Sequence, residues 1–136
     1  NLRSVYLMTQ RLQRHPYLAL FDGPDPNTTT EMRTDSTVPL QALFLMNNPF
    51  VQQRAAACAR RIIGQTHDPS ARIEFASRLA LGRAPNPTEF RRAAAFLEKF
   101  QHELAHSGTK PPELELEAWT SYAKVLLTSN EFVYVD

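Results

Sequence analysis

The feature that most constrains the fold is an asparagine or aspartate placed directly before a proline. It occurs at three points that are spaced like helix starts: Asn48-Pro49, Asp68-Pro69 and Asn86-Pro87. Asn and Asp side chains accept hydrogen bonds from the free N–H groups at the start of a helix, and proline suits the first helical position because no N–H is needed there. At the third point Glu89 stands three residues after Asn86, which adds the second half of a capping box. These signals predict helices that start at residues 49, 69 and 87.

Apolar residues behind these starts recur at helical spacing and not in the alternation typical of strands. After Pro49 they form a single stripe of Val51, Ala55, Cys58 and Ile62. Comparable stripes follow residues 69 and 87. We expect two further helices, one that ends at Met46 and one that begins near Glu113.

The N-terminal part is less regular. Residues 2–14 are compatible with a helix or a short strand that ends at Pro16, and residues 15–37 contain the turn formers Asp, Gly, Pro and Asn. We therefore predict an all-α fold, a compact bundle of five to six helices with one long Pro-rich loop near the N-terminus. Residues 1–136 are expected to form a single helical domain.

Composition narrows the classes of function. The 15 Lys and Arg residues against 14 Asp and Glu residues give a net charge of +1, which argues against a nucleic-acid partner. Apolar runs are only a few residues long, so no direct membrane insertion is expected. Cys58, the single cysteine, lies in an apolar stripe and is interpreted as a core residue. The oligomeric state stays open.

The segment His102-Glu103-Leu104-Ala105-His106 matches the zinc-protease motif H-E-x-x-H. In that chemistry two histidines one helical turn apart hold a zinc ion, and the glutamate acts as general base. Here His102 and His106 fall roughly opposite the apolar face of their helix, in its last turn, and no strands are expected to bind a substrate. A catalytic zinc would also need a third ligand, for which Glu117 or Glu131 could serve. The zinc metallopeptidase is therefore less favoured than a surface metal site at His102 and His106.

A second hypothesis concerns polar residues in and after the proline-rich loop. Asp22 and Asp25 could bind a cation, although such residues more commonly form turns. A ligand or saccharide site could use the same loop together with polar groups at the following helix. The candidate ligand-binding residues are Asp22, Asp25, Arg33, Gln41, Asn47 and Asn48.

Several motifs in this order resemble a known family. They are Arg3–Tyr6 (RSVY), Phe21–Asp25 (FDGPD), Met32–Leu43 (MRTDSTVPLQAL) with Met46–Pro49 (MNNP), Leu81–Pro85 (LGRAP) with Glu89, Ala118-Trp119, and Leu126–Asp136 (LLTSNEFVYVD). Together the motifs resemble the C-terminal domain of unknown function of large planctomycete cytochrome c-like multidomain proteins.

The resemblance implies that residues 1–136 are the C-terminal fragment of a longer, exported protein of the periplasm or cell surface. It implies haem elsewhere in that protein, while this chain has no Cys-x-x-Cys-His motif and no cofactor of its own. The expected function is that of a non-catalytic helical domain that packs against or positions the other domains of its parent chain. The alternative is a ligand-binding or saccharide-binding part of a polymer-degrading or electron-transfer assembly.

Overall fold

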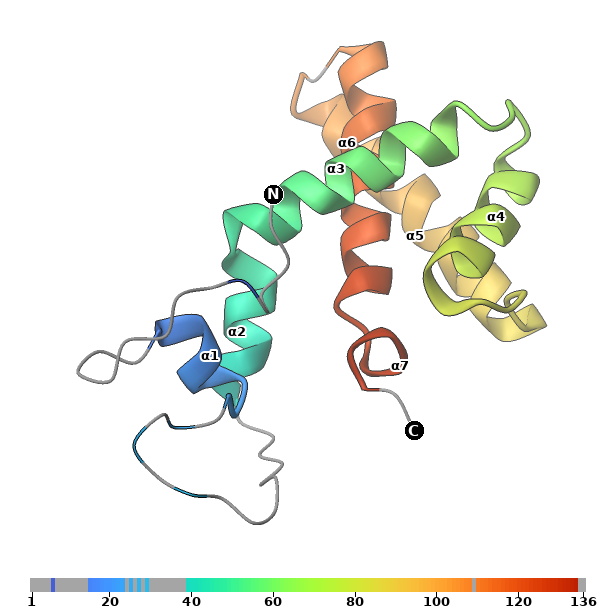
Figure 1. The fold of residues 1–136 in the computed structure, drawn as a ribbon. Coiled ribbons are helices and arrows are strands. Elements are labelled where there is room, and N and C mark those ends of the chain that lie inside the picture. The colour runs from blue at the N-terminus through green and yellow to red at the C-terminus, as the bar shows by residue number, and fades with distance from the viewer. Residues whose placement is uncertain are drawn as a thin grey trace. The chain divides into compact units, whose positions relative to one another are not determined.

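The structure is a computed structural model that describes residues 6, 15–23, 25, 27, 29, 39–108 and 110–134. Its helices are α1 (Pro16–Leu20), α2 (Pro39–Asn47), α3 (Pro49–Ile63), α4 (Pro69–Leu81), α5 (Pro87–His106), α6 (Pro111–Leu127) and α7 (Asn130–Val133) (Figure 1). The described residues contain no strand, so the all-α prediction is confirmed. None of the helices described is both long enough and apolar enough to cross a membrane.

The chain divides into two compact units, Asn1–Phe44 and Leu45–Asp136. Helix α1 belongs to the first unit and helices α3 to α7 belong to the second, while α2 runs through the boundary. The expectation of one domain over residues 1–136 stays a prediction.

The three predicted helix starts are confirmed by their hydrogen bonds. The Asn48 side chain accepts from the N–H of Phe50 at 2.8 Å, and the Asp68 carboxylate accepts from the first turn of α4. At α5 the capping box is complete, since the Asn86 side chain accepts from the N–H of Glu89 at 2.9 Å and the Glu89 carboxylate accepts from the N–H of Asn86 at 2.8 Å. The starts of α3, α4 and α5 are thus fixed by residues adjacent to their prolines.

Two short helices were missed. Pro16 was expected to end an element, but it is the first residue of α1, a position that proline favours because its φ angle is already helical. No helix was predicted over residues 130–133, which form α7 and pack against α4 and α6. The helix or strand expected over residues 2–14 lies outside the described residues, apart from Tyr6. So do residues 24, 26, 28 and 30–37 of the loop expected over 15–37.

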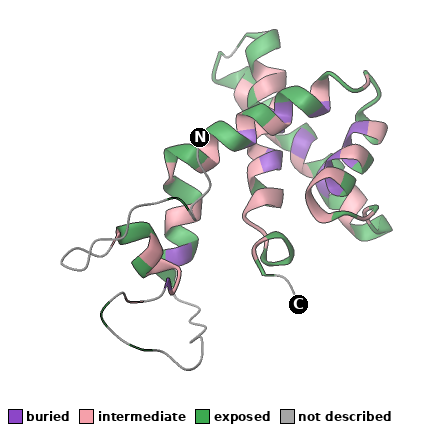
Figure 2. Cartoon of the chain, in the orientation of Figure 1, coloured by how far each residue is buried: buried purple, intermediate pink, exposed green. Residues whose placement is uncertain are grey.

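The core of the second unit is built on α6, which packs against α3 and α5. The contact of α3 with α6 is the most extensive between any two described helices. Alanines with no exposed surface lie on both helices, Ala55 and Ala59 on α3 and Ala118 and Ala123 on α6. Small side chains let two helix axes approach closely, and the space beside them is filled by Trp119, which is 2 % exposed. Figure 2 shows buried positions on α3, α4, α5 and α6.

Candidate functional site

Of the two aspartates in the proposed loop site, Asp25 has a local backbone role. The Asp25 carboxylate accepts a hydrogen bond from the N–H of Asn27 at 2.8 Å, which is the Asx turn that such loop residues commonly form. Asp22 has a φ angle of 52°, in the left-handed region where Asn and Asp are tolerated better than most residues. Arg33 lies outside the described residues.

The polar residues of and after α2 are placed in different settings. Gln41 is buried, and its side-chain nitrogen donates to the carbonyl oxygen of Leu20 at 2.9 Å, which ties α2 to the end of α1. Asn47 is exposed as the last residue of α2, and Asn48 caps α3. Gln41 belongs to the first unit with the two aspartates, whereas Asn47 and Asn48 belong to the second. Ligand binding by this set stays a prediction.

The histidine pair lies on the exposed side of α5, as the sequence predicted. His102 and His106 are both exposed, while Phe100 and Leu104 pack against the core. The Nδ1 atom of His106 lies 2.8 Å from the carbonyl oxygen of His102, so this nitrogen is engaged within the helix. Among the residues that the structure describes, no group of three or more His, Cys, Asp or Glu side chains could hold a metal ion. Glu131, imagined as a third ligand, is bound to Arg83 instead.

A buried arginine, which sequence reasoning missed, organises the start of α4. Arg72 is 4 % exposed, and its guanidinium donates to the carbonyl oxygens of Thr66 at 2.5 Å and Ile63 at 3.2 Å. It also donates to the carboxylate of Glu115 on α6 at 2.5 Å. Helical spacing in the sequence could have predicted the burial of Arg72. It stands four residues before Ala76 in the apolar stripe of α4 and therefore faces the core.

A second charged cluster joins the α4–α5 connection to α7. Arg83 donates twice to Glu89, at 2.8 and 2.9 Å, and twice to Glu131, at 2.6 and 2.7 Å. Bidentate pairs of this kind are shorter and stronger than ordinary hydrogen bonds. The Ser77 hydroxyl, which is buried, donates to the carbonyl oxygen of Arg83 at 2.9 Å and fixes the backbone of the connection. The cluster therefore holds α7 in place beside α4.

The Arg83 cluster gives a pH-dependent prediction. Hydrogen bonds from Arg83, and then from the N–H of Asn86, lower the pKa of Glu89 from 4.5 to about 2. Because the folded pKa lies below the ordinary value, the stabilisation by this carboxylate is complete above pH 4.5 and is lost as the pH falls toward about 2. A carbon-13 NMR titration of the Glu89 carboxyl group should give a midpoint of about 2.

The control separates this effect from a general effect of charge. Arg83→Met should move the Glu89 midpoint upward toward 4.5, whereas Arg91→Met, at an exposed position on the same helix as Glu89, should leave it at about 2. A midpoint near 4.5 in the unmodified chain would contradict the pairing.

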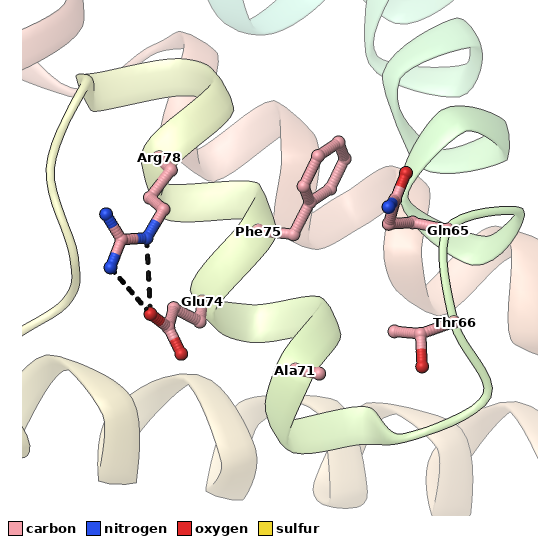
Figure 3. Close-up of a pocket in the computed structure, with 6 residues that line it drawn as sticks. All are labelled: Gln65, Thr66, Ala71, Glu74, Phe75 and Arg78. Carbon is pink, nitrogen blue, oxygen red and sulfur yellow. Dashed lines mark hydrogen bonds and ion pairs between the residues drawn. The ribbon is translucent and has the colours of Figure 1, made fainter.

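A shallow depression of about 280 Å³ lies beside α4 and the α3–α4 connection, lined by Gln65, Thr66, Ala71, Glu74, Phe75 and Arg78 (Figure 3). The charges there neutralise each other, since the Arg78 guanidinium donates to the Glu74 carboxylate at 2.8 and 3.2 Å. Figure 3 shows both side chains on one side of α4, with Phe75 directed toward Gln65. This depression provides an aromatic side chain but no convergent set of unpaired charges.

The exposed side of α2 carries an apolar surface. Leu40, Leu43 and Met46 follow one another at intervals of three residues and are 63 %, 52 % and 53 % exposed. At about 100° per residue they share one face, and the buried Gln41 lies roughly opposite to it. The sequence has no charged residue between Asp35 and Arg54. We call Leu40, Leu43 and Met46 the α2 face.

Comparison with family models matches residues 1–97 to PSD1, described as a protein of unknown function (DUF1553). The chain belongs to the PSD1 family. Comparisons with curated proteins and with solved structures give no match.

The PSD1 match and the folded units have different boundaries. Residues 1–97 include the α2 face, the start of α4 with Arg72, and the pair of Arg83 with Glu89. The partners that complete these clusters, Glu115 and Glu131, lie beyond residue 97, as does the whole of α6. The part of the chain that matches PSD1 thus packs on helices that follow it in the sequence.

Proposed function

We propose that this PSD1 chain is a non-catalytic helical domain that packs against, and positions, other domains of a large exported multidomain protein. The observation that carries the proposal is the α2 face. The apolar face of a helix is normally covered, but Leu40, Leu43 and Met46 are more than half exposed.

The composition of the α2 face supports a protein partner. The fully buried centres of protein interfaces are more apolar than the rest of the surface, depleted in charged residues and enriched in methionine. The α2 face has this character, and Gln41 on the other side of the helix holds α2 to the end of α1. The partner surface is expected to be apolar and uncharged in the same way.

The proposal about the kind of parent protein is based on the sequence motifs. Those within residues 1–97 agree with the PSD1 match, and their order supports a C-terminal position in a planctomycete cytochrome c-like protein of the periplasm or cell surface. Any haem of such a protein would be held by its other domains. The single cysteine of this chain does not fit a haem attached through two cysteines.

Hydrogen exchange tests the docking role. The amides of α2 should exchange more slowly in the full-length parent protein than in this chain alone, because burial of the α2 face stabilises the helix. In the parent protein, Leu40→Ser combined with Leu43→Ser should return the exchange of α2 to the faster rate, by about tenfold or more, since each leucine contributes roughly 1.5–3 kcal/mol when buried.

The matched control is Val125→Ser on α6, whose side chain is 54 % exposed and lies outside the α2 face. It should leave the exchange of α2 unchanged. Circular dichroism of each variant shows whether the helices are retained. Equal exchange of α2 in the parent protein and in the isolated chain would overturn the proposal.

A further inference from the structure

A groove of about 570 Å³ lies among α4, α5 and α6, all within the second unit. Its apolar lining comes from all three helices and includes Ile73, Phe90, Leu97 and Trp119. Pockets that bind small molecules are commonly of this volume, with an apolar floor and a few polar groups that orient the ligand. The groove has such a volume, an apolar lining and several polar side chains.

The charged groups at the groove are not balanced. Arg72 reaches it, but its guanidinium is buried and already donates to two carbonyl oxygens and to Oε1 of Glu115. Glu98 also lines the groove, is exposed, and has no hydrogen-bond or ion-pair partner within the described residues. His67 and His102 also line the groove and are counted as neutral, so that one positive and two negative charges leave an excess of one carboxylate.

This balance decides which ligand the groove favours. An anion would have to displace Glu115 from Arg72, and it would face Glu98. A cation meets the carboxylate of Glu98 without breaking an existing contact, and it can also approach the Oε2 atom of Glu115, which makes no hydrogen bond among the described residues. Hydrogen bonds to charged groups are shorter and roughly twice as strong as those between neutral groups.

We propose that the groove binds a small organic cation, an ammonium or guanidinium group carried on an aromatic or alkyl body. The cationic group pairs with Glu98, and the apolar body lies against Phe90 and Leu97. This site is distinct from the α2 face, and its existence does not depend on the docking role.

Trp119 makes the proposal testable, because it is the single tryptophan of the chain and lines the groove. Phenethylamine added to the full chain should change the fluorescence of Trp119 in a saturable way. Phenylethanol, with the same body and no charge, should bind about tenfold more weakly, and hydrocinnamate, with the opposite charge, more weakly still.

A pair of variants locates the cation. Glu98→Gln should weaken the binding of phenethylamine about tenfold, a loss of one charge-assisted hydrogen bond. Glu103→Gln is the matched control, because Glu103 is exposed on the same helix and does not line the groove. It should leave the affinity unchanged.

Each of the following results would overturn the proposal: no saturable response to phenethylamine at millimolar concentration, tighter binding of hydrocinnamate than of phenethylamine, or equal affinity in the Glu98→Gln variant. A response to a lysine-containing peptide without one to phenethylamine would also overturn it, in favour of a peptide-binding groove. None of these results bears on hydrogen exchange at α2, so the two proposals fail separately.

Discussion

Replacing Trp119 by alanine is expected to lower the free energy of unfolding by about 4 kcal/mol, because a large core side chain is removed and a cavity remains. Trp119 is 2 % exposed, stacks edge-on against Tyr122 with ring centroids 5.9 Å apart, and lies under the guanidinium of Arg72 at 5.8 Å. For a chain of this length the loss corresponds to a fall of roughly 10–15 °C in Tm. Thermal unfolding followed by circular dichroism measures it.

Two further variants test whether the loss of stability comes from the core position of Trp119. Trp119→Phe retains most of the ring and should cost about half as much, so that it reports on the core even where the alanine variant does not fold. Val125→Ala on the same helix removes an exposed side chain, 54 % accessible, and should cost less than about 0.5 kcal/mol. A loss below about 1.5 kcal/mol for Trp119→Ala would show that α6 does not form the centre of the core.

Local signals in the sequence account for much of the fold. The pairing of Asn or Asp with proline placed the starts of α3, α4 and α5, since both the cap and the first helical residue are set by neighbouring atoms. Gly82 ends α4 with a φ angle of 72°, a conformation that glycine adopts without a steric penalty. The stripe of α3 correctly identified Ala55 and Ile62 as buried.

Contacts between distant residues could not be found in this way. Cys58 was interpreted as a core residue, and it lies at the edge of the core, where burial raises the pKa of its thiol. The pairing of Arg83 with Glu131 joins residues 48 positions apart, and no periodicity connects them. Nor could the sequence show that Leu40 and Leu43 of α2 remain exposed, because apolar residues at helical spacing ordinarily predict a covered face.

The candidate sites illustrate the same limit. Sequence reasoning assigned functional interest to loop aspartates and to an H-E-x-x-H match, which are local patterns. In the described residues Asp25 makes an Asx turn and His106 contacts the backbone of its own helix. The groove, in contrast, requires three helices to come together, and Glu98 attracts attention only once Arg72 is seen to be paired with Glu115.

Arg72→Met is expected to lower the free energy of unfolding by about 3 kcal/mol, although methionine fills a similar volume. The substitution removes hydrogen bonds to the carbonyl oxygens of Ile63 and Thr66, and leaves Glu115 without its cation. Arg72→Lys should cost nearly as much, because one ammonium group cannot reach three acceptors that the planar guanidinium reaches at once. Chemical denaturation measures each loss.

Glu115→Gln separates the contribution of the carboxylate partner of Arg72 from that of its backbone carbonyl partners. The Glu115 side chain is 44 % exposed and an amide oxygen still accepts a hydrogen bond, so this variant should cost only about 1 kcal/mol or less. If the double variant with Arg72→Met is barely less stable than Arg72→Met alone, most of the effect of Arg72 lies in the two backbone carbonyls that it holds. In that case Arg72 chiefly stabilises the α3–α4 connection, and the Glu115 carboxylate remains accessible to a ligand in the groove. A neutral or stabilising effect of Arg72→Met would show instead that water satisfies those carbonyls.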